Sequence, residues 1–297
     1  MNLTSPLRRG LLAAALVLSL SPLALAAPFA SERISVQTVG SGSDVVLVPG
    51  LNSSPRVWAE LLKAVPGHRY HLVHVNGFAG RPAGANAEGL VSAPVAEEVA
   101  RYIGVAGLDK PAIIGHSMGG SIALMVAARH PQAVSKLMVV DMLPFLGQLF
   151  GKPGTTAESI KPTADAIVAR MRTEDPVARR ANAENTLKGM INTESMRAGA
   201  VEDSNTSVQD VSARAYHELI VTDLTPELHN IVVPASVLYV IPKGLPFNEA
   251  QFAAFYKSAY AQLGGVKLSY IPDAAHFLMW DQPARFQAEV AAFLDAK

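Results

Sequence analysis

The sequence predicts an α/β protein with a mostly parallel sheet that helices cover on both faces. Short apolar runs alternate along the chain with longer segments of helical periodicity. Most of these runs are apolar at nearly every position, which is typical of parallel strands that are buried on both faces. The alternation is interrupted once, in the middle of the chain, and then resumes. These observations favour one sheet domain that contains an insertion.

Four apolar runs in the first half of the chain predict strands. They are residues 45–50, 70–75, 111–115 and 136–141. The segment after the first run places Val57, Leu61 and Val65 on one helical face. The segment before the third run also has helical periodicity and ends near a glycine, which is a common helix stop. The first half therefore predicts alternating strands and helices.

The alternation stops after Asp141. Residues 144–220 show helical periods and loops, but no convincing apolar strand. Strands are predicted again at 236–241 and 267–272, with helices at 248–263 and 282–294. We therefore predict an α/β core of residues 27–143 and 221–297, interrupted by a helical cap at 144–220.

The composition excludes several classes of function. The 297 residues include 25 basic and 25 acidic side chains and have a formal net charge of zero. This balance argues against nucleic acid or an anionic membrane surface as a partner. The chain contains no cysteine, which excludes disulfides and thiol catalysis. We expect a small-molecule substrate.

The N-terminal segment has the pattern of a signal peptide. Arg8 and Arg9 precede a long apolar stretch, and Ala24-Leu25-Ala26 offers small residues at the spacing that a signal peptidase accepts. An uncleaved membrane anchor is the alternative, because the stretch is nearly long enough to span a bilayer. Pro22 favours cleavage. We predict a signal peptide at 1–26, no membrane anchor after processing, and a periplasmic or secreted protein.

A serine lies at the predicted junction of a strand and a helix. Residues 115–119, Gly-His-Ser-Met-Gly, fit the pattern G-x-S-x-G in the context that this pattern requires. Such a turn forces Ser117 into a strained backbone conformation and exposes its hydroxyl at the helix N-terminus. There the N–H of Met118 can stabilise an oxyanion. The alternative is an ordinary serine N-cap. The surrounding strand and helix favour a nucleophile.

A serine nucleophile needs a base, and His276 is the best candidate. It follows the last predicted strand, at the sheet edge where parallel α/β proteins build their sites. An ordinary loop histidine is the alternative interpretation. His68, His71 and His74 point to alternating faces of a strand and make a poor metal site. Those three residues are expected to be structural or exposed.

Four segments resemble the α/β-hydrolase superfamily. They are "VVLVPGLNSS", "HVNGFAG", "GHSMGG" and "DAAHFLMWDQP". The resemblance spans nearly all of the chain after residue 27 and is strongest to cap-bearing, esterase-like members. It implies that Ser117 is the nucleophile and His276 the general base. It also implies an oxyanion hole made by the N–H groups of Leu51 and Met118, with no metal and no organic cofactor.

The sequence departs from the family pattern at the triad acid. Leu245 stands about where an aspartate is usually found. Of four candidate carboxylates, Asp141 is the predicted acid, because it ends the strand after the elbow helix and projects at the correct edge. Glu249 is expected on the following helix, Asp273 only three residues before the base, and Asp281 as the cap of the last helix. Asp141 could also simply tie down a loop.

These features predict a secreted serine hydrolase that cleaves a carboxylic ester or a related acyl compound through an acyl-enzyme. A lactonase or a carbon–carbon hydrolase would use the same residues, and a binding protein of the same fold could have lost its acid. Serine at the elbow disfavours haloalkane and epoxide hydrolases of this fold. The apolar segment 143–150 could line an acyl pocket or pack as core.

Overall fold

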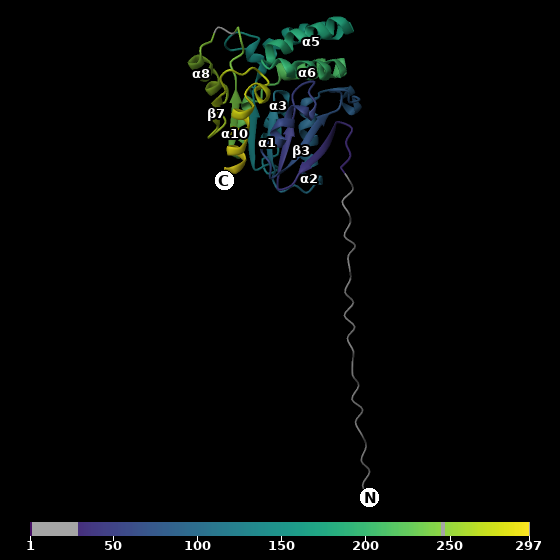
Figure 1. Cartoon of the computed structure of the whole chain (residues 1–297), viewed down its shortest axis with the longest axis vertical. Helices are drawn as coiled ribbons and strands as arrows, with labels where there is room; N and C mark the ends of the chain where they lie inside the picture. The colour runs from purple at the N-terminus through teal and green to yellow at the C-terminus, as the bar shows by residue number, and fades with distance from the viewer. Residues whose placement is uncertain (2–28, 245–246, 297) are drawn as a thin grey trace.

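The computed structural model describes Met1, residues 29–244 and residues 247–296 (Figure 1). The predicted signal peptide (apart from Met1) and Leu245 lie outside these residues. The fold is built on a seven-stranded sheet in the order β1-β3-β2-β4-β5-β6-β7. β1 pairs antiparallel with β3, and every other pair is parallel. The predicted fold class is confirmed.

The strands follow the predicted apolar runs closely. They are β1 (Ile34–Gly40), β2 (Ser43–Val48), β3 (His68–Val75), β4 (Ala112–His116), β5 (Lys136–Val140), β6 (Ala235–Tyr239) and β7 (Lys267–Tyr270). β1 was not among the predicted strands. Its N-terminal residue Ile34 is buried but its C-terminal half is exposed, as suits an edge strand, so it carries no continuous apolar run.

The described residues contain ten α-helices. They are α1 (Ala59–Ala64), α2 (Ser92–Val105), α3 (Met118–Arg129), α4 (Ala157–Thr173), α5 (Pro176–Met190), α6 (Glu194–Thr206), α7 (Gln209–Val221), α8 (Glu249–Ala259), α9 (Leu278–Asp281) and α10 (Pro283–Asp295). None of the helices in the described ranges is long and apolar enough to cross a bilayer.

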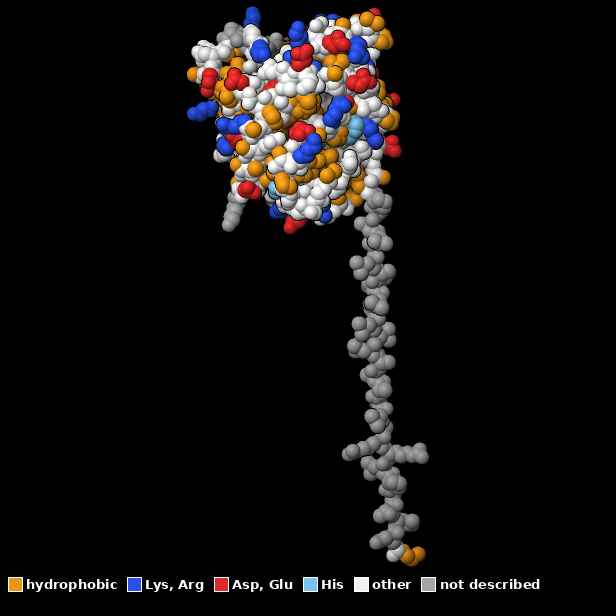
Figure 2. Space-filling view, viewed as in Figure 1, with side chains coloured by type: hydrophobic (Ala, Val, Ile, Leu, Met, Phe, Trp, Pro, Cys, Tyr) orange, Lys and Arg blue, Asp and Glu red, His pale blue; other side chains and the backbone are white. Residues whose placement is uncertain are grey.

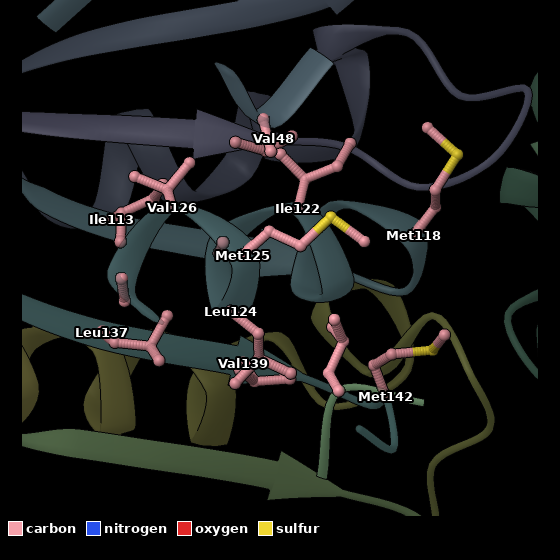
Figure 3. Close-up of a cluster of buried hydrophobic side chains, with 14 of the residues drawn as sticks. Val48, Ile113, Met118, Ile122, Leu124, Met125, Val126, Leu137, Val139 and Met142 are labelled. Atoms are coloured by element: carbon pink, nitrogen blue, oxygen red, sulfur yellow. The ribbon is translucent and has the colours of Figure 1, made fainter. Parts of the chain in front are cut away.

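Two hydrophobic cores lie on the two faces of the sheet. Val46 and Val48 of β2 join the core with α2, α3 and α8, whereas Val45 and Leu47 join the core with α1, α9 and α10. This division follows from the strand geometry, in which successive side chains point to opposite faces. Figure 3 shows the first core around α3, where Ile122 and Val126 meet strand residues such as Ile113.

Four helices lie between β5 and β6, in the part of the chain predicted as an insertion. α4 packs on α7 and α5 packs on α6, and α5 and α6 lie at one end of the molecule (Figure 1). We call residues 142–234 the insertion. Within the apolar segment 143–150, Leu143 and Phe145 are buried in hydrophobic cores, whereas Leu149 and Phe150 are each 39% exposed. Leu143 and Phe145, in the first part of the segment, therefore pack as core residues.

The charged side chains are mixed on the visible face of the molecule. Figure 2 shows lysine and arginine interspersed with aspartate and glutamate, without a broad region of one sign on that face. This distribution agrees with the equal numbers of basic and acidic residues in the sequence.

Candidate active site

Ser117 occupies a strained turn between β4 and α3. Its backbone has φ 53° and ψ −123°, and non-glycine residues seldom adopt a positive φ. The N–H of Ser117 donates to the carbonyl of Val140 at 2.9 Å, and the N–H of Gly120 donates to the carbonyl of Ser117 at 2.7 Å. Ser117 stands at the N-cap position, but its side chain makes no capping hydrogen bond. The ordinary N-cap interpretation therefore does not describe this serine.

The glycines around Ser117 are required by close backbone contacts. A Cβ on Gly115 would lie 2.0 Å from the carbonyl oxygen of Gly119, and a Cβ on Gly119 would lie 2.1 Å from that of Val48. Both distances are far below van der Waals contact. Neither position can accept a side chain without moving the backbone that holds Ser117.

We expect Gly119→Ala to lower the free energy of unfolding by about 3 kcal/mol, because the added methyl group meets rigid backbone. Urea denaturation of the purified protein measures this change. Gly104→Ala is the matched control. Gly104 is also helical, has open space at its Cβ position, and should tolerate alanine without loss. Equal stabilities of the two variants would contradict the packing argument.

The structure brings His276 and Asp141 together. His276 Nδ1 lies 2.6 Å from Oδ2 of Asp141, in the range of a short, charge-assisted hydrogen bond. Asp141 directly follows β5, has a φ of 50°, and is 8% exposed. The N–H of Val240 donates to its Oδ1 at 3.1 Å. The backbone and a second hydrogen bond therefore hold the carboxylate toward the imidazole.

The other three candidate carboxylates do not occupy this position. Glu249 is the exposed first residue of α8, and Asp273 is exposed on a turn. The prediction that Asp281 caps the last helix is wrong. Asp281 ends α9, and Gln282 stands at the N-cap of α10 without a side-chain capping bond. The helical turn of α9 directs the Asp281 carboxylate back toward the loop that carries His276.

Asp281 ties this loop to the insertion. Its carboxylate accepts hydrogen bonds from the N–H of Ala275 at 2.8 Å, of Thr193 at 2.8 Å and of Asn192 at 3.1 Å. Ala275 is the residue before His276, and the other two lie between α5 and α6. The N–H of Phe277 also donates to the carbonyl of Met190, at the end of α5, at 3.1 Å. The loop of the predicted base is thus held on both sides of His276.

Leu51 and Met118, the predicted oxyanion-hole residues, lie on segments close to Ser117. A Cβ on Gly50, the residue before Leu51, would lie 3.0 Å from Cβ of Ser117, so the two loops are in contact. Met118 is the first residue of α3. Within residues 29–244 and 247–296, neither N–H donates a hydrogen bond. Both N–H groups thus have no acceptor in the described part of the chain, as the predicted oxyanion hole would require.

The insertion also fixes the loop that carries Leu51. The Asp203 carboxylate of α6 accepts from the hydroxyl of Ser54 at 2.8 Å and forms an ion pair with Arg56 at 2.9 Å. Ser212 of α7 donates from its hydroxyl to Oδ1 of Asn52 at 2.6 Å. Two helices of the insertion thus hold the residues that directly follow Leu51.

Tyr256 is a site residue that the sequence did not reveal. It lies on α8, and its hydroxyl is 3.5 Å from Oδ1 of Asp141. Burial raises the pKa of Tyr256 well above its usual value, and the negative charge of Asp141 is the second cause of this shift. The phenol therefore remains a proton donor. The two residues are separated by 115 positions, and no motif connects them.

No group of three or more His, Cys, Asp or Glu side chains in the described residues is arranged to hold a metal ion. The histidines predicted to be structural or exposed take part in local contacts. His71, for example, is buried and bonds Asp44 and Tyr102.

The family follows from a direct comparison. The family model described as alpha/beta hydrolase fold matches residues 45–210, more than half of the chain. The chain belongs to the α/β-hydrolase fold family. This result confirms the resemblance to the superfamily, and the roles of Ser117, His276, Leu51 and Met118 stay predictions.

Individual relatives are hydrolases by name. The proposed carbamate hydrolase RutD of Yersinia enterocolitica is 32% identical over 38% of this chain and 41% of its own length. A pimeloyl-[acyl-carrier protein] methyl ester esterase of Pectobacterium carotovorum is 28% identical over 88% of this chain and 98% of its own length. An esterase structure from Exiguobacterium antarcticum superposes with a TM-score of 0.71 and 19% identity, covering 89% of this chain and 96% of that chain. The chain spans about two fifths of the length of the first curated relatives that it matches.

Proposed function

We propose that this α/β hydrolase cleaves a carboxylic ester or a related small acyl compound through a serine acyl-enzyme. The observation that carries the proposal is the 2.6 Å contact between Asp141 and His276 at the same sheet edge as the strained Ser117. The names of the relatives, an ester hydrolase among them, support the same chemistry.

The proposed reaction has two halves. Ser117 Oγ attacks the substrate carbonyl while Nε2 of His276 takes the hydroxyl proton, and the N–H groups of Leu51 and Met118 stabilise the oxyanion. The C–O bond to the alcohol then breaks, and His276 returns the proton to the leaving oxygen. In the second half, His276 takes a proton from the water that attacks the acyl carbon. The bond between that carbon and Ser117 Oγ then breaks, His276 returns the proton to Oγ, and the acid leaves. Asp141 holds the imidazole tautomer and stabilises the imidazolium.

A fluorophosphonate probe followed by a substrate panel tests this function. The probe should label Ser117, because only an activated serine reacts readily with it, and peptide mass analysis locates the label. The panel should contain esters of short and long acids, lactones and β-diketones, with acid release followed by pH-stat. Absence of both labelling and turnover would contradict the proposal. Labelling with turnover of lactones or diketones alone would move the assignment to those substrates.

We also propose that the protein is exported and processed. The pattern of Arg8, Arg9, the apolar stretch and Ala24-Leu25-Ala26 leads us to expect a mature N-terminus at Ala27. N-terminal sequencing of the protein from the extracytoplasmic fraction measures this directly. A membrane-bound form that retains Met1 would show that the segment is an anchor.

A further inference from the structure

His116, the second residue of the G-x-S-x-G motif, contacts each part of the site described above. It directly precedes Ser117 in the chain, and its side chain is 0% exposed. The His116 ring lies 4.7 Å from that of His276 and 4.8 Å from that of Phe277, measured between ring centroids. On the other side, a Cβ on Gly50 would lie 3.2 Å from Nδ1 of His116. One buried ring therefore connects the serine turn, the histidine loop and the oxyanion loop.

The hydrogen bond of His116 defines its tautomer. Nε2 lies 3.0 Å from the backbone carbonyl oxygen of His276. A carbonyl oxygen only accepts, so Nε2 carries the proton and donates it. Nδ1 then has only a lone pair. Burial, with a smaller contribution from the nearby His276, holds the pKa of His116 well below its usual value, so the ring stays neutral at neutral pH.

The Nδ1 atom of His116 is buried and has no hydrogen-bond partner in the described structure. An unsatisfied buried acceptor destabilises a fold, and an apolar side chain at position 116 would avoid that cost. A histidine here is therefore hard to explain by stability. What it provides is the Nε2–H donor at the carbonyl of His276, together with a ring that packs at a tilt of 44° against the imidazole.

We propose that His116 is a positioning residue for the base. Its Nε2–H holds the backbone of His276 and its tilted ring packs against the imidazole, so that Nδ1 of His276 meets Asp141. A misplacement of reacting groups by about 1 Å can lower a rate by about 100-fold. This inference rests on the proposed function, because it assigns a role within the same site.

Two variants of His116 separate positioning from packing. His116→Leu retains apolar bulk but removes the donor, and it should lower kcat by about 10- to 100-fold with KM nearly unchanged. His116→Gln places an amide N–H near the Nε2 position and should retain kcat within about threefold of the parent. His130→Gln is the matched control. His130 lies at the end of α3, pairs with Glu97 at 2.8 Å, and should leave both constants unchanged.

Denaturant unfolding distinguishes positioning from a purely structural role of His116. If the role were purely structural, the substitutions would lower the free energy of unfolding together with the activity. We expect His116→Leu to stay close to the parental stability, because removing the unsatisfied Nδ1 offsets the loss of the donor to the His276 carbonyl. A loss of activity that is matched by a loss of stability, with His116→Gln equally impaired, would overturn the proposal. Parental kcat in His116→Leu would also overturn it.

Proton NMR tests the positioning without any turnover. The short Nδ1–H···Oδ2 bond of His276 to Asp141 should give a far-downfield proton signal in the parent and in His116→Gln, and this signal should shift or broaden in His116→Leu. An unchanged signal in His116→Leu would contradict the positioning role. If the parent neither reacts with the fluorophosphonate nor hydrolyses any substrate, the proposed function fails, while the NMR comparison still decides the role of His116.

Discussion

Replacing Ser117 with alanine is expected to lower ester turnover by about a millionfold and to abolish fluorophosphonate labelling. The reason is that Ser117 carries the hydroxyl at the strained turn between β4 and α3, next to Met118, whose N–H we predict to stabilise the oxyanion. The small residual rate would come from the oxyanion hole and substrate binding. Initial rates on the best ester of the panel, at high enzyme concentration, measure the loss.

Ser121→Ala is the control for this experiment. Ser121 lies one helical turn further along α3, is buried, and is not part of the proposed machinery. This variant should retain both turnover and labelling. The stability of Ser117→Ala should remain close to the parental value, since the serine side chain makes no capping bond. Near-parental turnover by a folded Ser117→Ala protein would show that the nucleophile lies elsewhere.

Replacing Asp141 with asparagine is expected to lower kcat by about four orders of magnitude and to change KM little. The amide keeps an oxygen that can accept from Val240 N–H, so the fold should survive. The variant loses the negative charge that stabilises the imidazolium of His276, and it no longer enforces the correct tautomer. Steady-state kinetics and circular dichroism measure the two effects separately.

Glu249→Gln is the matched carboxylate control, because Glu249 lies four residues after Leu245, about where the family resemblance implies an acid. It is exposed at the start of α8, so its neutralisation should leave kcat unchanged. Retained activity in Asp141→Asn together with lost activity in Glu249→Gln would reverse the assignment. Loss in both variants would point to an effect of net charge instead.

The sequence could predict those parts of the fold that are determined by residues adjacent in the chain. Strands buried on both faces need nearly continuous apolar runs, so β2, β4 and β5 could be recognised. The edge strand β1 has no such requirement and was missed. The serine turn was predictable because its glycines, its strand and its helix are neighbours in the chain. Asp141 was predictable from its place at a strand end beside the elbow.

The rest of the candidate site depends on contacts between distant segments. Tyr256 meets Asp141, and His116 meets His276, only because the sheet brings α8 and the last loop to one edge. Asp281 looked like a helix cap because a proline follows it two residues later, as at many helix starts. The structure instead directs its carboxylate to three N–H groups of the loops. Periodicity and motifs do not reveal such partners.

The tethers of the insertion determine when activity can arise as the chain folds. The loop after Leu51 takes partners from Asp203 and Ser212, and the loop of His276 is joined through Asp281 to the segment between α5 and α6. Glu218 of α7 also accepts three N–H bonds from the start of α2. A chain with a folded sheet but an undocked insertion would lack these tethers on the loops of Leu51 and His276. For the proposed hydrolase, we therefore expect activity to require a docked insertion as well as a folded sheet.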